Sequence, residues 1–187
     1  MKQNKQILIS LLLLTLVAAL YRILPGRPYG FAPQWAIALF AGAVIRDKKW
    51  ALAIPVLSMF ISDFFYQILY INHLSPIAGF YQGQWINYLL FASVTFFGFL
   101  IKKITIRNVV LLSLAAPTYF FLVSNFLTWA GVGEFVSYPK TMTGLLTCYA
   151  MGLPFYWVSL VATLVFSAIF FISYYLLKKS TARPAIG

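Results

Sequence analysis

The stretch from Ser62 to Leu74, SDFFYQILYINHL, places the carboxylate of Asp63 inside an otherwise apolar run. Asp63 is one of only three acidic residues in the 187-residue chain. Near the centre of a membrane helix, a carboxylate costs roughly 2.5–3.5 kcal/mol on insertion scales. Asp63 therefore needs a compensating partner. That partner is either a bound ligand or a group of the chain, such as the guanidinium of Arg22 or a neighbouring backbone.

Other polar and aromatic side chains are predicted to lie at a similar depth. At the helical rise per residue, Asp63 lies about 20 Å along its predicted helix, and Asn125 and Trp129 lie about 24 and 30 Å along theirs. Further groups fall near the same ends of the remaining apolar segments: Gln34, Trp35, Asn87, Tyr88, Tyr156 and Trp157. Flat rings that stack on a ligand, together with a few fixed polar groups that orient it, are typical of a small-molecule pocket.

Each of these residues also has a purely structural interpretation. Asn125 is equally suited to hydrogen bonding between helices, which contributes about 0.6–2 kcal/mol in membranes. Trp35, Trp85 and Trp129 could form an aromatic belt at the membrane surface.

The inventory of reactive side chains is too small for a recognisable catalytic centre. The chain has one histidine, His73, and one cysteine, Cys148, and it contains no HExxH, GxGxxG or phosphate-loop motif. A lone histidine or a lone cysteine is a weak metal ligand set. We therefore expect no enzymatic activity, no metal and no cofactor.

The composition indicates what positions these residues. The chain is 62% hydrophobic and 9% charged, with a mean hydropathy of +0.87, so we predict a single all-α integral membrane domain. The net charge of +11 does not indicate nucleic-acid binding, because the basic residues lie at the ends of apolar segments. Six membrane spans are predicted, at residues 7–24, 31–45, 50–71, 85–101, 109–130 and 154–177.

The basic residues predict the orientation of this six-helix bundle. With both termini in the cytoplasm, eleven of the fourteen fall on the cytoplasmic side and only Arg22, Arg27 and Lys140 outside. The eleven are Lys2, Lys5, Arg46, Lys48, Lys49, Lys102, Lys103, Arg107, Lys178, Lys179 and Arg183. The first segment also has features of a signal peptide, but its apolar run continues to Leu24, so we expect it to be retained.

The connections on the outer side are long and rich in apolar residues. We expect them to fold back over the bundle as a lid that includes residues 131–152, with TMTGLLTCYAMGL as a short interfacial or re-entrant helix.

Small residues recur four apart in the second segment, at Ala32 and Ala36 and at Ala38 and Gly42. Such a face serves either packing inside the bundle or contact with another membrane protein. The second possibility gives an alternative function, that of a membrane assembly subunit.

Three strings carry a resemblance: FAPQWAIALFAGAVIRDKKWALAIPVLSMFISDFFY, FFLVSNFLTW and YPKTMTGLLTCYAMGLPFYW. They resemble an uncharacterised bacterial family of putative transport proteins, which is similar in turn to the substrate-binding S components of energy-coupling-factor (ECF) vitamin transporters. The resemblance implies six helices, cytoplasmic termini and an outer pocket closed by loops. It also implies partners, namely a membrane coupling subunit and ATPases. The first segment offers only Ala18 and Ala19 for such coupling, which leaves open whether the protein acts alone.

From these observations we predict a substrate-binding subunit of the bacterial inner membrane that takes up a micronutrient, such as a vitamin or related heterocycle. Its partners are the small molecule and the lipid bilayer. The expected ligand is aromatic, and the carboxylate of Asp63 would suit a cationic one. We expect seven residues to contact the ligand: Asp63 and Asn125 by hydrogen bonds, Trp129, Trp35 and Tyr156 by stacking, and Asn87 and Arg22 beside them.

Overall fold

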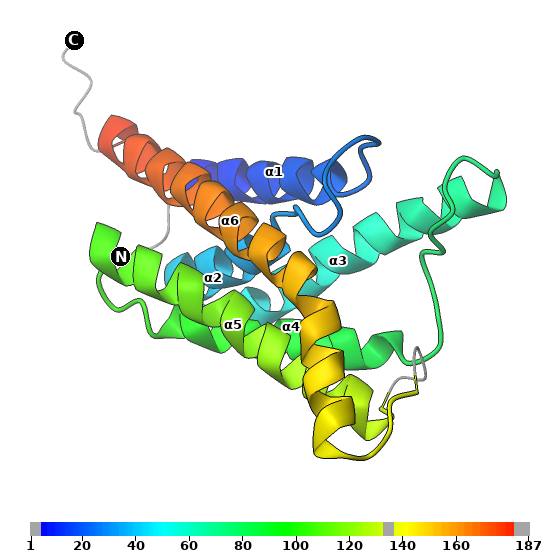
Figure 1. Ribbon diagram of the computed structural model, residues 1–187. Coiled ribbons are helices and arrows are strands. Elements are labelled where there is room, and N and C mark those ends of the chain that lie inside the picture. The colour runs from blue at the N-terminus through cyan, green and yellow to red at the C-terminus, as the bar shows by residue number, and fades with distance from the viewer. Residues whose placement is uncertain (1–4, 133–136, 182–187) are drawn as a thin grey trace, which may run out of the picture.

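The computed structural model describes residues 5–132 and 137–181, and every regular element in these ranges is an α-helix. There are six such helices (Figure 1): α1 (Lys5–Tyr21), α2 (Gln34–Val44), α3 (Lys48–Ile71), α4 (Gln84–Phe99), α5 (Ile106–Ala130) and α6 (Met142–Thr181). The all-helical fold class predicted from the sequence is confirmed.

Three helices, α3, α5 and α6, are long and apolar enough to cross a membrane. The starts of α3 and α5 are fixed by side chains: Asp47 accepts a hydrogen bond from the Lys49 amide at 2.9 Å, and Thr105 accepts one from the Asn108 amide at 3.3 Å. α5 ends at Gly131, whose φ of 85° is the left-handed conformation that glycine adopts easily.

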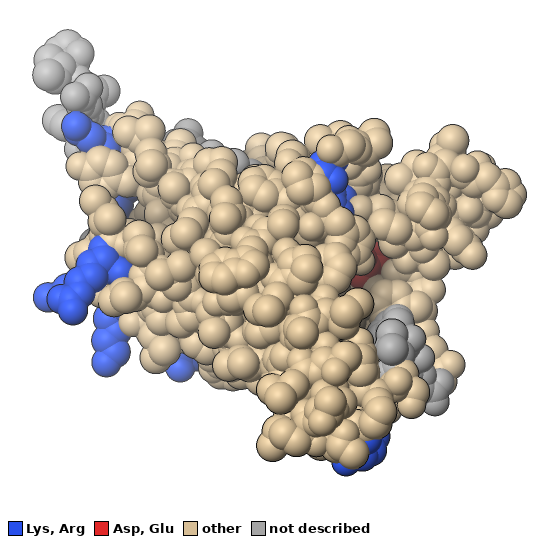
Figure 2. All heavy atoms as spheres, viewed as in Figure 1, with Lys and Arg blue, Asp and Glu red and all other residues tan. Residues whose placement is uncertain are grey.

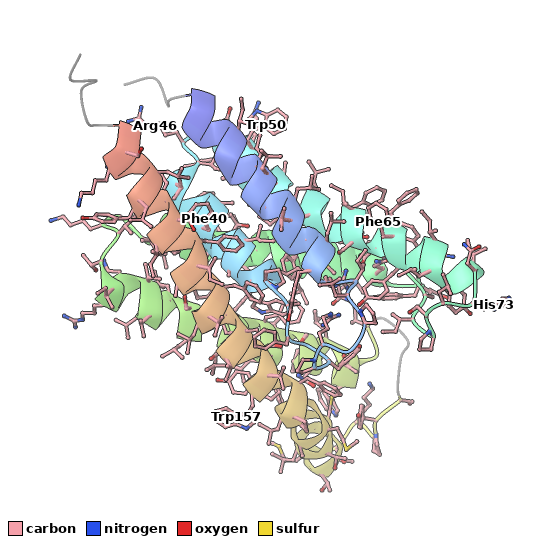
Figure 3. All side chains as sticks on the ribbon, turned by 90° about the horizontal axis from the view of Figure 1, so that it is seen from above. Phe40, Arg46, Trp50, Phe65, His73 and Trp157 are labelled. Atoms are coloured by element: carbon pink, nitrogen blue, oxygen red, sulfur yellow. The ribbon has the colours of Figure 1, made fainter. Side chains whose placement is uncertain are left out.

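α2 is the central helix of the molecule and packs against all five others. Ala36, Ala38 and Leu39 are fully buried, and Phe40 lies among the rings of Phe170 and Phe171 on α6 (Figure 3). The segment predicted at 31–45 thus contains only 11 helical residues, about 16 Å of helix, whereas the hydrocarbon core is about 30 Å thick. α2 starts three residues later than the predicted segment, at Gln34, and Pro33 is its N-cap residue.

The small-residue face of α2 is used inside the molecule. Ala32, Ala36, Ala38 and Gly42 are all buried, and Gly42 lies against the α4 backbone. This face therefore leaves no area for a partner protein.

α6 is one continuous helix of 40 residues. The expectation of a separate short helix in TMTGLLTCYAMGL is wrong, because Met142 begins the same helix that was predicted to start at Pro154. Pro154 lies inside it, where a missing N–H and the proline ring bend a helix, and α6 changes direction where its colour passes from yellow to orange (Figure 1). Of the predicted lid, residues 133–136 lie outside the described part of the chain.

Several polar side chains are buried, and many large apolar side chains are exposed. On α3, Ser62 and Asp63 are buried while Phe64 is 50% exposed. Between α5 and α6, Ser113 donates a hydrogen bond to Ser167 at 2.9 Å in the interior. Apolar solvent would favour this arrangement, because internal hydrogen bonds such as this one can satisfy polar groups that lipid cannot.

The two ends of the molecule differ in charge. α1 begins and α6 ends at the same end (Figure 1), and most of the Lys and Arg side chains visible in Figure 2 gather there. Arg46 and Trp50 lie at this end and His73 lies at the opposite one (Figure 3). Lys2 and Arg183 lie outside the described residues.

Candidate functional site

A cavity of about 360 Å³ lies at the start of α2. Its wall combines the connection between α1 and α2, the loop between α3 and α4, and the facing parts of α4, α5 and α6. Most of the lining is aromatic or apolar, and the polar members are Arg22, Arg27, Gln34, Asn87, Ser124, Asn125 and Ser159. This volume falls at the lower end of the range of small-molecule pockets, roughly 300–1,000 Å³.

Gln34, the first residue of α2, lines this cavity and carries an unusual buried polar group. Its side chain is 2% exposed, yet neither its amide nitrogen nor its amide oxygen has a hydrogen-bond partner. The indole N–H of the neighbouring Trp35 is also buried and unpaired. Leaving a buried polar group without a partner costs about 1–3 kcal/mol, so these groups are available to a partner that the described part of the chain does not supply.

Two arginines border the same space. Arg27 donates from Nε to the Arg22 carbonyl oxygen at 2.6 Å and from Nη2 to the Tyr66 hydroxyl at 2.7 Å. A longer bond of 3.3 Å joins Arg27 Nη1 to the Phe31 carbonyl oxygen. These bonds hold the Arg27 guanidinium in place, and among the described residues its acceptors are neutral oxygens.

Asp63 is held by protein groups. It forms an ion pair with Arg22, and its other carboxylate oxygen accepts hydrogen bonds from Gln84 Nε2 at 2.6 Å and from the Tyr88 hydroxyl at 2.9 Å. Its side chain is 3% exposed and does not line the cavity. Of the partners considered from the sequence, Arg22 is the one observed.

Five of the seven predicted ligand-contacting residues line the cavity together: Arg22, Trp35, Asn87, Asn125 and Tyr156. Asp63 and Trp129 do not. Trp129 donates its indole N–H to the Pro139 carbonyl oxygen at 2.9 Å, and Lys140 Nζ lies 5.7 Å from the centroid of its ring. Trp129 therefore holds the connection between α5 and α6, because its N–H and its ring contact Pro139 and Lys140 of that connection.

Asn125 of α5 and Tyr156 of α6 both line the cavity where these two helices meet. The Asn125 amide donates to the Phe121 carbonyl oxygen at 2.8 Å, and Tyr156 shares a 2.9 Å hydrogen bond with Thr118. Gly152 allows the Asn125 side chain to lie against α6, because a Cβ on Gly152 would lie 2.6 Å from Asn125 Oδ1. The Phe121 and Tyr156 rings, with centroids 4.7 Å apart, complete an aromatic wall.

The loop between α3 and α4 folds back toward the bundle. Gln67 Oε1 accepts hydrogen bonds from the amides of Gly79 and Phe80, at 3.0 and 3.1 Å. The loop thereby brings Tyr81 to the cavity, where its hydroxyl accepts a 2.6 Å bond from Asn87. Burial raises the pKa of the Tyr81 phenol, which keeps it neutral at physiological pH.

The model that defines a family of unknown function (DUF6580) matches residues 1–185. The chain belongs to this family. No curated protein and no solved structure matches this DUF6580 chain.

Gln34 and Arg27 are two polar residues of the site that the sequence interpretation of this DUF6580 protein did not select. Gln34 was placed at the right depth but was not assigned a contact, although a glutamine beside a tryptophan at the start of an apolar run is the available signal. Arg27 lies in the connection PGRPYG, where only the folded chain shows it turned inward. Within the described ranges, no three His, Cys, Asp or Glu side chains lie close enough together to hold a metal ion.

Proposed function

We propose that this DUF6580 protein is the substrate-binding membrane subunit of an uptake system for a small micronutrient, such as a vitamin or a related heterocycle. The observation that carries this proposal is the pair of buried, unpaired polar groups of Gln34 and Trp35 in a cavity of about 360 Å³. A bound molecule that pairs with them would recover the free energy lost by burying them.

The distribution of charge supports an orientation in the bacterial inner membrane. Positively charged loops stay in the cytoplasm, so in this proposal the basic end, with both termini, lies on the cytoplasmic side. The cavity then opens on the outer side. In this proposal all six helices form the membrane bundle. α2 enters it only part-way, because its length covers about half of the hydrocarbon core.

The resemblance to ECF S components suggests a coupling subunit and ATPases as the energy source. In the alternative, the protein binds its ligand without them. The assembly-subunit alternative is the weaker one, because the small residues that would meet a partner are buried inside the molecule, with Gly42 against α4. No side-chain cluster described above favours an enzymatic role.

Native mass spectrometry of the full chain, purified gently from its own membrane, tests the proposal. We expect a retained small molecule that is lost in Gln34→Met, a change that removes the amide but keeps a long side chain. Thr95→Val is the matched control, because the Thr95 hydroxyl is also buried and unpaired but does not line the cavity. A bare wild-type protein, or one that carries only another membrane protein, would contradict the proposal.

A further inference from the structure

The side chains that line the cavity also indicate the charge of its ligand. Resting on the proposed function, we infer that the ligand is an anion: a one- or two-ring molecule whose carboxylate, or a similar oxyanion, binds between Arg27 and the first turn of α2.

The charged side chains at the cavity favour a bound anion. Arg22 and Asp63 form an ion pair, so their charges largely cancel. Arg27 adds a second positive charge, and its hydrogen bonds go to neutral oxygens. The other acid in the described part of the chain, Asp47, caps α3 at the far end of the molecule. Glu134 lies outside the described residues. The described wall thus carries one uncompensated positive charge in a largely apolar setting, where a charge without a counter-ion is costly.

The start of α2 also favours a bound anion. Its N-cap is Pro33, whose side chain cannot accept a hydrogen bond, so the first-turn N–H groups receive no capping bond from the N-cap residue. The positive end of the helix dipole favours an anion at this position. Membrane transporters use interrupted helices in the same way to bind anionic groups.

The unpaired side chains of Gln34 and Trp35 favour a bound anion independently of Arg27 and of the helix dipole. Gln34 Nε2 and Trp35 Nε1 are hydrogen-bond donors, are buried, and belong to residues that line the cavity. A carboxylate offers about four acceptor positions and can therefore satisfy two donors and still receive a guanidinium.

The remaining walls suit the apolar part of the ligand. Trp35 contacts Phe91 and Phe120 edge-on, with ring centroids 5.1 and 4.8 Å apart, and Phe155 closes another side. This arrangement reverses the cationic preference that Asp63 suggested from the sequence, because the carboxylate is already neutralised by Arg22.

Ring-matched probes separate charge from shape. The full chain in detergent micelles is titrated with indole-3-acetate, indole-3-acetamide and tryptamine, and with benzoate, benzamide and benzylamine, while its melting temperature is followed. We expect at least one acid to raise the melting temperature. Its amide should bind at least about tenfold more weakly, the loss expected without the charge-assisted bonds, and the amine should have no effect.

Variants assign the effect to Arg27 and Gln34. Arg27→Gln should abolish the preference of acid over amide, whereas Arg27→Lys should keep most of it because it keeps the charge. Gln34→Met should weaken binding of the acid about tenfold. Because the amide of Gln34 is unpaired without ligand, this variant should also raise the melting temperature of the empty protein. Thr95→Val should leave the probe affinities unchanged.

The outcomes separate this inference from the proposed function. If the amide or the amine binds as tightly as the acid, the inference is overturned while ligand binding stands. If none of the six probes binds, the molecule retained in native mass spectrometry decides: a neutral or cationic one overturns the inference alone. A protein without any retained molecule overturns both.

Discussion

Gly42 of α2 and Gly98 of α4 bring the two helix backbones into direct contact. A Cβ added to Gly42 would lie 2.9 Å from the Gly98 Cα, and one added to Gly98 would lie 2.8 Å from the Gly42 Cα. Real Cβ atoms essentially never approach another atom so closely. This contact fixes α2 against α4 and hence the position of Gln34 at the other end of α2.

We expect Gly42→Ala and Gly98→Ala each to destabilise the protein by at least about 1–3 kcal/mol, because helix backbone must move to admit the methyl group. Unfolding in mixed detergent micelles measures the loss. Gly26→Ala is the control: its surroundings are open, so only the cost of its left-handed φ of 79° remains. Equal losses in all three variants would contradict the close packing.

Asp63→Asn should lower stability rather than act on the ligand alone. The substitution leaves the Arg22 guanidinium without its counter-ion, and breaking a buried pair costs about 3–5 kcal/mol. Tyr88→Phe, which removes one neutral donor to the same carboxylate, should cost about 1–2 kcal/mol. Asp47→Asn is the matched acid-to-amide control, since asparagine also caps helices. If Asp63→Asn abolished binding of a retained ligand at unchanged stability, a direct ligand contact would be established instead.

Gly152→Ala should disturb the cavity through Asn125. The added methyl group meets the Asn125 amide, which must turn away and release the Phe121 carbonyl. If the amide contacts the ligand, Gly152→Ala and Asn125→Ala should lower affinity by similar factors, and the double variant should lose no more than either single one. Additive losses in this cycle would show that the two residues act separately.

The two tryptophans of the predicted site should respond in opposite ways to replacement by phenylalanine. Trp35→Phe removes an unpaired N–H of the cavity, so affinity should fall while stability is kept. Trp129→Phe removes the bond to Pro139 and should cost about 1 kcal/mol, with faster proteolysis between α5 and α6 and unchanged affinity. A greater loss of ligand affinity in the Trp129 variant would return that residue to the site.

Labelling of introduced cysteines with a membrane-impermeant maleimide tests the orientation. In a Cys148→Ala background, Lys140→Cys should react in intact cells, whereas Lys102→Cys should react only after the membrane is opened. The reverse pattern would invert the topology and place the cavity on the cytoplasmic side.

The positions of the helices were predictable because apolar segments bounded by basic residues leave few alternatives. α3, predicted at 50–71, extends from Lys48 to Ile71, and Asp47 provides its cap. The short α2 and the continuous α6 were harder, since burial on all sides and a proline within a helix depend on tertiary packing. Within the site, Asn125 and Tyr156 were found from depth alone. Depth along α3 could not show that Asp63 is already paired, because its partner Arg22 lies in the connection after α1.

The shortness of α2 has an electrical consequence. If the cavity opens to the outer solution, a charge bound at Gln34 has only about 16 Å of packed helix between it and the cytoplasmic end of α2. Part of the membrane voltage then falls across the cavity and part across α2. An anion would therefore feel only a fraction of the roughly 2.3 kcal/mol per 100 mV on binding, and the rest on release into the cell. Binding should accordingly depend weakly on membrane potential, while the transport step should depend on it more strongly.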